Sequence, residues 1–149
     1  MNRLLITAAL AASSACGGGE APASDTALAA PAAPAPVGAV TILSPADNDS
    51  TGPDVTIVLG KENVAIEPAS GARAEGVGHH HLFLDTTATP DGAVIPPTSS
   101  RVVHLGTGDS TYTFKGLPPG PHEVIAVIAY GDHAAMNARR DTVRFVVRR

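Results

Sequence analysis

The chain has 149 residues, a formal net charge of −4 and a single cysteine. This length leaves room for one folded domain once segments that do not fold are set aside. A negative charge without a basic stripe argues against a nucleic-acid partner, and one cysteine excludes an intramolecular disulfide. Tryptophan is absent and aromatic residues are few, so the core must be built mainly from Val, Ile, Leu and Ala.

The first part of the chain has the layout of a secretory signal. A short basic start is followed by an apolar run over residues 4–12, and small residues then precede Cys16. The apolar run is too short to span a bilayer as a permanent helix. We therefore expect residues 1–15 to be a signal peptide and the protein to be exported.

Two ways of processing this signal compete. Ser13 and Ala15 fit the small-x-small pattern of an ordinary signal peptidase. Cys16, which is followed by three glycines, fits lipoprotein processing better, although Ser13 stands where such signals usually carry Leu. We favour lipidation of Cys16, since two or three acyl chains suffice for stable anchoring. The expected location is then the periplasm or the outer membrane, with the membrane as a partner through the lipid.

Residues 16–39 form the next segment, which is rich in Gly, Ala and Pro. Proline at this density removes hydrogen-bond donors and disfavours helix, so an extended, polyproline-like linker is expected. We assign this linker no binding role and place the folded domain at residues 40–149.

The folded domain reads as a series of short β-strands. Apolar residues alternate with polar ones in most of these segments, and turn-forming residues separate them. The expected strands are 40–43, 55–59, 79–85, 101–105, 111–114, 122–130 and 142–148. About seven strands without a convincing helix indicate an all-β fold, an immunoglobulin-like antiparallel β-sandwich.

A local motif supports this fold class. The stretch Leu117-Pro118-Pro119-Gly120-Pro121-His122 resembles the Leu-x-Pro-Gly-x-Tyr corner before the sixth strand of many immunoglobulin-like domains. His122 stands where the tyrosine would be. We expect its imidazole to hydrogen-bond the backbone across the corner, with a ligand role as the alternative.

The candidate chemistry lies in the histidines, all six of which fall in the expected domain. On a strand, His79 and His81 share one face and lie close enough to bind one metal ion. Imidazole suits Cu(II), Zn and Ni, and a nearby thioether shifts the preference toward Cu(I). We therefore predict a metal site, with copper favoured and zinc as the alternative. Its ligands would be His79, His81 and His133, with His104 or Met136.

Two alternatives stay open. The histidines may serve only as hydrogen-bonding groups in a non-catalytic envelope interaction or structural domain. An enzyme is the third possibility, and it has the least support because no nucleophile elbow, zinc-protease helix or phosphate-binding glycine loop occurs. Nothing in the spacing of the acidic residues selects a catalytic pair, and we interpret them as solvated loop charges: Glu62, Glu67, Asp85, Asp109 and Asp132.

Several motifs in combination resemble a family of bacterial secreted domains, the domain of unknown function numbered 4399. They are Gly78-His79-His80-His81-Leu82-Phe83-Leu84-Asp85, Ile95-Pro96, His104-Leu105-Gly106-Thr107-Gly108, the 117–122 corner and Gly131-Asp132-His133. The resemblance covers roughly residues 40–147. It implies an exported β-sandwich with histidine positions at His79, His81, His104, His122 and His133, and it implies no activity.

The sequence thus predicts an exported lipoprotein that binds a transition metal and is not an enzyme, with an envelope protein as a further partner. Because a metal binds neutral imidazole, we expect its affinity to fall as the pH drops below about 6.5, the usual imidazole pKa.

Overall fold

The computed structural model describes residues 38–149. The predicted signal peptide, the lipidation of Cys16 and nearly all of the predicted linker lie outside the described residues. Within residues 38–149, no helix is long and apolar enough to cross a membrane.

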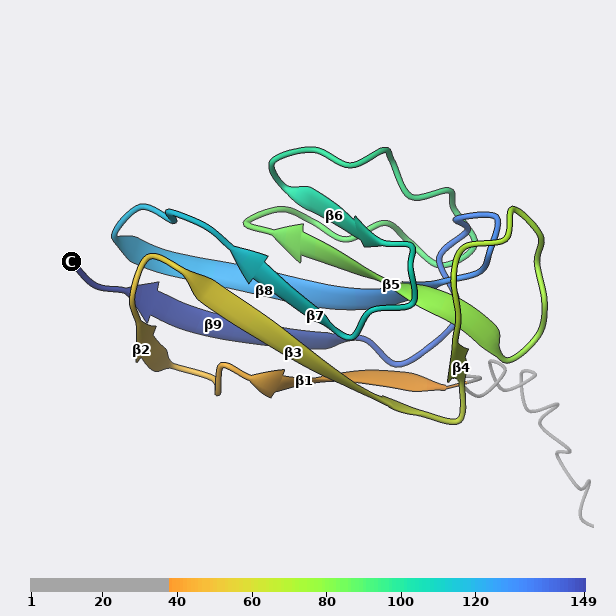
Figure 1. Ribbon diagram of the computed structural model, residues 1–149, viewed down its shortest axis with the longest axis horizontal. Helices are drawn as coiled ribbons and strands as arrows, with labels where there is room; N and C mark the ends of the chain where they lie inside the picture. The colour runs from red at the N-terminus through yellow and green to blue at the C-terminus, as the bar shows by residue number, and fades with distance from the viewer. Residues whose placement is uncertain (1–37) are drawn as a thin grey trace, which may run out of the picture. The chain divides into compact units, whose positions relative to one another are not determined.

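The described residues form nine strands in two sheets that pack face to face (Figure 1). The smaller sheet has the order β1-β3-β7, and the larger has the order β2-β9-β8-β5-β4, with β6 also paired to β5. The strands are β1 (Ala39–Ser44), β2 (Asp49–Thr51), β3 (Val55–Glu62), β4 (Ala65–Ile66), β5 (Val77–Leu84), β6 (Val102–Leu105), β7 (Thr111–Phe114), β8 (Gly120–Ala129) and β9 (Asp141–Val147). The all-β sandwich is confirmed.

Two short strands, β2 and β4, add to the seven that the sequence predicts. Each pairs in parallel, β2 with β9 and β4 with β5, whereas the remaining strand pairs are antiparallel. The polar sequence of β2 lies in a segment rich in turn-forming residues. Its strand conformation comes from pairing with β9 rather than from local propensity, because strand formation depends strongly on tertiary context.

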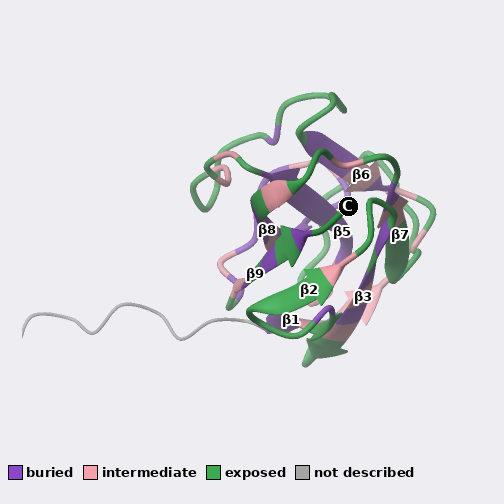
Figure 2. Cartoon of the chain, turned by 90° about the vertical axis from the view of Figure 1, so that its left-hand side faces the viewer, coloured by how far each residue is buried: buried purple, intermediate pink, exposed green. Residues whose placement is uncertain are grey.

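The main hydrophobic core fills the space between the two sheets. Alternate residues of each strand point into it, as the period-two pattern requires. From β5 these are Leu82 and Leu84, and they pack with Ile57 of β3 and Phe145 of β9. In Figure 2 the buried residues, in purple, run along β5, while β2 is largely exposed.

A second, smaller cluster lies on the other face of the larger sheet, away from the main core. Phe83 and Val102 contribute to it from neighbouring strands, and Ile95 covers them from the loop 85–101. This loop hydrogen-bonds to the loop 130–140, as Ala135 donates to Ala93 at 2.9 Å. The two loops lie side by side at one end of the sandwich (Figure 1). Both faces of β5 are therefore covered, which explains why nearly all of its residues are buried.

Candidate metal centre

Three of the histidines share the outer face of the larger sheet. His79 and His81 lie on either side of His80 along β5 and share the opposite face from it, and His104 on β6 is the direct cross-strand partner of His81. Paired residues lie on the same face of a sheet, with Cβ atoms about 5 Å apart. The strand register therefore brings the three imidazoles together.

His133 reaches the same place from the tight turn after β8. Its backbone is in the left-handed region, with φ of 66°. The His133 N–H donates to the Tyr130 carbonyl at 2.9 Å, and its own carbonyl accepts from the Ile95 N–H at 2.9 Å. These bonds hold the turn against the loop 85–101 and place the imidazole over the sheet.

The four rings converge on one point. Each histidine offers one nitrogen, and these four nitrogens all lie within 4.8 Å of one another: His79, His81, His104 and His133. The Nε2 atoms of His79 and His81 are 3.0 Å apart, and those of His104 and His133 are 3.2 Å apart. Four nitrogens around a zinc ion at its usual bond length would be about 3.3 Å apart. Two of the nitrogen pairs therefore have the spacing expected in a four-coordinate metal site, and the whole set lies within 4.8 Å.

Burial divides the cluster into two pairs. His79 and His81 are 0 % and 1 % exposed, whereas His104 and His133 are partly exposed. The Nδ1 atoms of both buried rings have no hydrogen-bond partner among the described residues. The two rings are thus hydrogen-bonded only to each other, through Nε2.

The pKa values of three of the clustered histidines, His79, His81 and His104, are lowered, which favours their neutral form. Burial is the main cause, and the neighbouring histidines add to it: the pKa of His79 falls to about 4 and that of His81 to about 3. Burial and the nearby His133 also lower the pKa of His104. Neutral imidazole is the form that binds a metal ion.

Gly106 allows the His104 ring to take its position. A Cβ at residue 106 would overlap the Cε1 and Nε2 atoms of His104. The imidazole therefore lies against the backbone of Gly106, in space that only glycine leaves open. No spacing rule in the sequence indicates its contact with a histidine two positions earlier.

Met136 does not join the histidines. It is fully buried in the main core between the sheets, and its N–H donates to the Ile128 carbonyl. Ala135, the preceding residue, packs instead in the cluster on the outer face. The chain alternates between the two faces here, which turns the thioether away from the imidazoles. The suggested role of Met136 as a ligand is therefore not supported.

A cleft opens beside the cluster and has a volume of about 350 Å³. His81, His104 and His133 line it, together with Asp132 and an apolar segment of the loop 85–101, residues 94–98. Asp132 is not free: Arg73 contacts its Oδ2 at 3.2 Å, and its Oδ1 accepts from the Ala134 N–H at 3.1 Å. These contacts, with the Ala134 N–H bond the largest cause, lower the pKa of Asp132. Asp132 is thus a partly exposed loop charge whose two oxygens both have partners.

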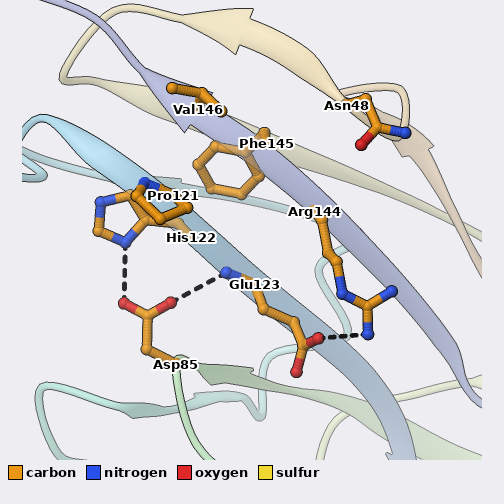
Figure 3. Close-up of a pocket in the computed structure, with 8 residues that line it drawn as sticks. All are labelled: Asn48, Asp85, Pro121, His122, Glu123, Arg144, Phe145 and Val146. Carbon is orange, nitrogen blue, oxygen red and sulfur yellow. Dashed lines mark hydrogen bonds and ion pairs between the residues drawn. The ribbon is translucent and has the colours of Figure 1, made fainter.

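His122 lies at the opposite end of β8 and has the structural role predicted for it. Its Nε2 and the Pro118 carbonyl are 2.9 Å apart, across the corner. Its Nδ1 lies 2.8 Å from Oδ2 of Asp85 (Figure 3). Burial opposes the charged form, but the Pro118 carbonyl and the Asp85 carboxylate outweigh it and raise the pKa of His122.

Asp85 is the residue that sequence reasoning missed at this corner. Its second carboxylate oxygen accepts from the Glu123 N–H at 2.9 Å, so it joins the end of β5 to the start of β8. Asp85 is an exposed residue, as expected, but it also has this structural role, which the sequence did not indicate. A cavity of about 390 Å³ lies beside it, walled by Phe145 and by the ion pair between Glu123 and Arg144 (Figure 3).

Comparisons with known proteins agree with the resemblance seen in the sequence. A family model described as a domain of unknown function, DUF4399, matches residues 57–148. No curated protein matches the chain. A solved structure of fibronectin(III)-like modules of CbhA from Clostridium thermocellum is similar at 15 % identity and a TM-score of 0.46. The match covers 76 % of this chain and 47 % of that one, so the chain spans about half its length. Because the family model covers more than half of the chain, the protein belongs to the DUF4399 family.

Proposed function

We propose that this protein is a transition-metal binding module, with Cu(II) as the tightest ligand and Zn(II) as its main competitor. The observation that carries the proposal is the convergence of four imidazole nitrogens within 4.8 Å of one another. These imidazoles come from two strands and a loop, and they are separated in sequence by up to 54 positions between His79 and His133.

A purely hydrogen-bonding role explains this cluster less well. In a pair of facing neutral imidazoles one Nε2 donates and the other accepts, so the accepting ring carries its proton on Nδ1. That Nδ1 is buried and has no partner among the described residues, in His79 as in His81. A buried donor without a partner costs about 1–3 kcal/mol. Metal coordination at Nε2 would leave Nδ1 without a partner as well, but the free energy of metal binding would exceed that cost, because the ion accepts the lone pairs of all four rings at once.

The ligand set decides the metal. With Met136 in the core, the soft thioether that would favour Cu(I) is absent from the site. Four imidazoles suit Cu(II), Zn(II) and Ni(II), and the general order of affinity among divalent ions places copper first. We therefore keep copper as the favoured metal but assign it the Cu(II) state.

We further propose that the module binds without catalysing a reaction and is anchored at the envelope through lipidated Cys16. Asp132 is the carboxylate among the described residues that line the cleft, and both of its oxygens are engaged. It is therefore poorly placed to act as a general base. The expected signal peptide supports export, and export would expose the site to metal ions in the cell envelope.

Metal titration of the full chain tests this proposal. A Cys16→Ser background removes the thiol as a competing ligand, and calorimetry with elemental analysis gives affinity and stoichiometry. We expect one Cu(II) per chain in this background and a loss of at least about 100-fold in affinity in His79→Ala/His81→Ala. His122→Ala serves as the matched control and should bind as the background does. No stoichiometric copper or zinc uptake at micromolar metal would overturn the proposal.

A further inference from the structure

We propose that the cleft beside the histidine cluster takes a small organic anion, a monocarboxylate with an apolar tail, as an additional ligand of the bound metal. This inference rests on the proposed metal site and extends it. The volume of the cleft, about 350 Å³, is in the range of pockets that hold small molecules. Such pockets are usually apolar with a few convergent polar groups.

The position of the cleft gives a ligand access to the metal. His81, His104 and His133 line it, and the fourth histidine of the cluster, His79, does not. The cleft thus meets the cluster on the side where the histidines are partly exposed rather than on the buried side. A Cu(II) ion with four nitrogen ligands prefers a tetragonal arrangement, which leaves room for a further ligand from the open side.

The wall of the cleft favours an apolar tail. Val94 is 70 % exposed and is followed by Ile95, Pro96 and Pro97, all of which line the cleft. The segment is held in place by a β-bridge between Val94 and Ala134 and by the hydrogen bond from Ile95 to His133. A fixed, exposed apolar side chain beside a metal site gains free energy when a ligand covers it, in proportion to the area removed from water.

Charge selects an anion, and only when the metal is present. The charge of Asp132, which lies at the cleft, is offset by Arg73. No Lys or Arg is among the residues that line the cleft, so without metal it offers an anion no permanent positive charge. A divalent ion held by neutral ligands adds two positive charges in a partly desolvated place, where electrostatic attraction is stronger than in water.

The test uses the Cu(II)-loaded full chain in the Cys16→Ser background at constant pH, titrated with formate, acetate, butyrate and hexanoate. The visible absorption and electron paramagnetic resonance of Cu(II) report ligand exchange at the metal. We expect a spectral change with each anion and an affinity that rises by about two- to fourfold for each added methylene.

Two exposed apolar residues provide a matched pair of variants. Val94→Thr keeps the shape of the side chain but makes the wall of the cleft polar. The affinity for the anions should then depend less on tail length, while the affinity for Cu(II) stays unchanged. Leu43→Thr replaces an equally exposed residue, 63 % exposed, on β1 of the smaller sheet, and should leave the series unaltered.

The outcomes separate this inference from the proposed function. Stoichiometric copper binding with no spectral response, or with equal affinity along the series, would overturn the anion site and leave the metal site standing. Equal binding of the anions to the metal-free chain, measured by nuclear magnetic resonance shifts, would also overturn it. A chain that takes up no metal would overturn both.

Discussion

At one end of β8 four imidazoles face one another, whereas at the other end His122 faces a carboxylate and a carbonyl. The first group has no acidic partner among the described residues, and burial lowers the pKa values of its two innermost members to about 4 and about 3. At the second site burial also acts to lower the pKa of His122, but the Pro118 carbonyl and the Asp85 carboxylate outweigh it and raise the pKa. The partner, more than burial, thus decides the charge state of a histidine here.

This difference has a structural meaning. The corner histidine makes hydrogen bonds with both ring nitrogens, to Asp85 and to Pro118, and so has the full complement of partners of a structural residue. His79 and His81 are more deeply buried, yet each leaves one ring nitrogen without a partner among residues 38–149. A buried polar group left in this way costs free energy, and in the cluster the free energy of metal binding at Nε2 would offset that cost.

The largest expected effect is stabilisation by metal. A ligand that binds only the folded state at about 1000 times its Kd stabilises that state by about 4 kcal/mol. We expect Cu(II) to raise the free energy of unfolding by this amount in the parent chain and in His122→Ala. In His79→Ala/His81→Ala the gain should vanish. Chemical denaturation with and without metal measures this gain. An equal gain in the double variant would show that the four-histidine cluster is not the metal site and does not differ from the His122 corner in this respect.

The second effect is loss of stability in acid for the metal-free chain. Between the usual pKa of 6.5 and the lowered values of about 4 and about 3, His79 and His81 are protonated in the unfolded state but not in the folded one. The unfolded state then binds more protons, so stability falls as the pH drops. Since one pKa unit corresponds to about 1.4 kcal/mol for each of the two groups, we expect a loss of about 4 kcal/mol between pH 6.5 and about pH 4.5.

Denaturation curves of the chelator-treated protein across this pH range measure the loss. His79→Gln/His81→Gln should flatten the pH dependence without abolishing it, because burial also lowers the pKa of His80 on the inner face. The same low pKa values revise the sequence-based expectation for metal affinity. The two buried ligands stay deprotonated well below pH 6.5, so proton competition at them begins at lower pH. A double variant as acid-sensitive as the parent would show that the cluster is not the origin of the loss.

The corner should respond to pH with the opposite sign. A raised pKa contributes stability that is fully present below 6.5 and is lost as the pH rises through the folded-state pKa. His122→Ala should therefore cost about 1.5 kcal/mol at about pH 6 and less at about pH 8. Asp85→Asn retains a residue suited to the left-handed backbone there, with φ of 49°, and should lower the pKa of His122 in a nuclear magnetic resonance titration. An unchanged pKa in Asp85→Asn would contradict the assigned pairing.

The sequence predicted the two ends unequally well. The corner follows from a local motif in which His122 replaces tyrosine, and its bond to Pro118 spans only a few residues. The shared face of His79 and His81 follows from the two-residue period of a strand. By contrast, His104 joins them only because β6 pairs with β5 in one particular register. The register between two distant segments cannot be predicted from the sequence of either strand alone.

Proximity along the chain was a poor guide at the loop after β8. Met136 follows His133 closely, yet it turns into the main core while its neighbour Ala135 packs on the outer face. The bridge between Ala135 and Ala129 sets this alternation. The segment 94–98 beside the site gave only a weak signal, its two prolines next to apolar residues, because the position of a loop depends on tertiary contacts with distant segments.

The smallest effect on the free energy of unfolding is expected for substitution of His133. This residue gives the clearest contrast with the structural histidine His122. Its left-handed backbone, with φ of 66°, costs a non-glycine residue about 1 kcal/mol, and glycine would avoid that cost while adding freedom to the unfolded chain. His133→Gly should therefore leave the free energy of unfolding of the metal-free chain within about 0.5 kcal/mol of the parent, and His133→Ala should be the less stable variant of the two.

Both variants at His133 remove the same imidazole, so both should lose at least about tenfold in Cu(II) affinity. At His122 the pattern is reversed, since substitution there lowers stability and leaves metal affinity intact. Denaturation and metal titration of the same samples measure both quantities. A His133→Gly chain that binds copper as tightly as the parent would show that the strained histidine serves the turn rather than the metal, and the cluster would lose its fourth ligand.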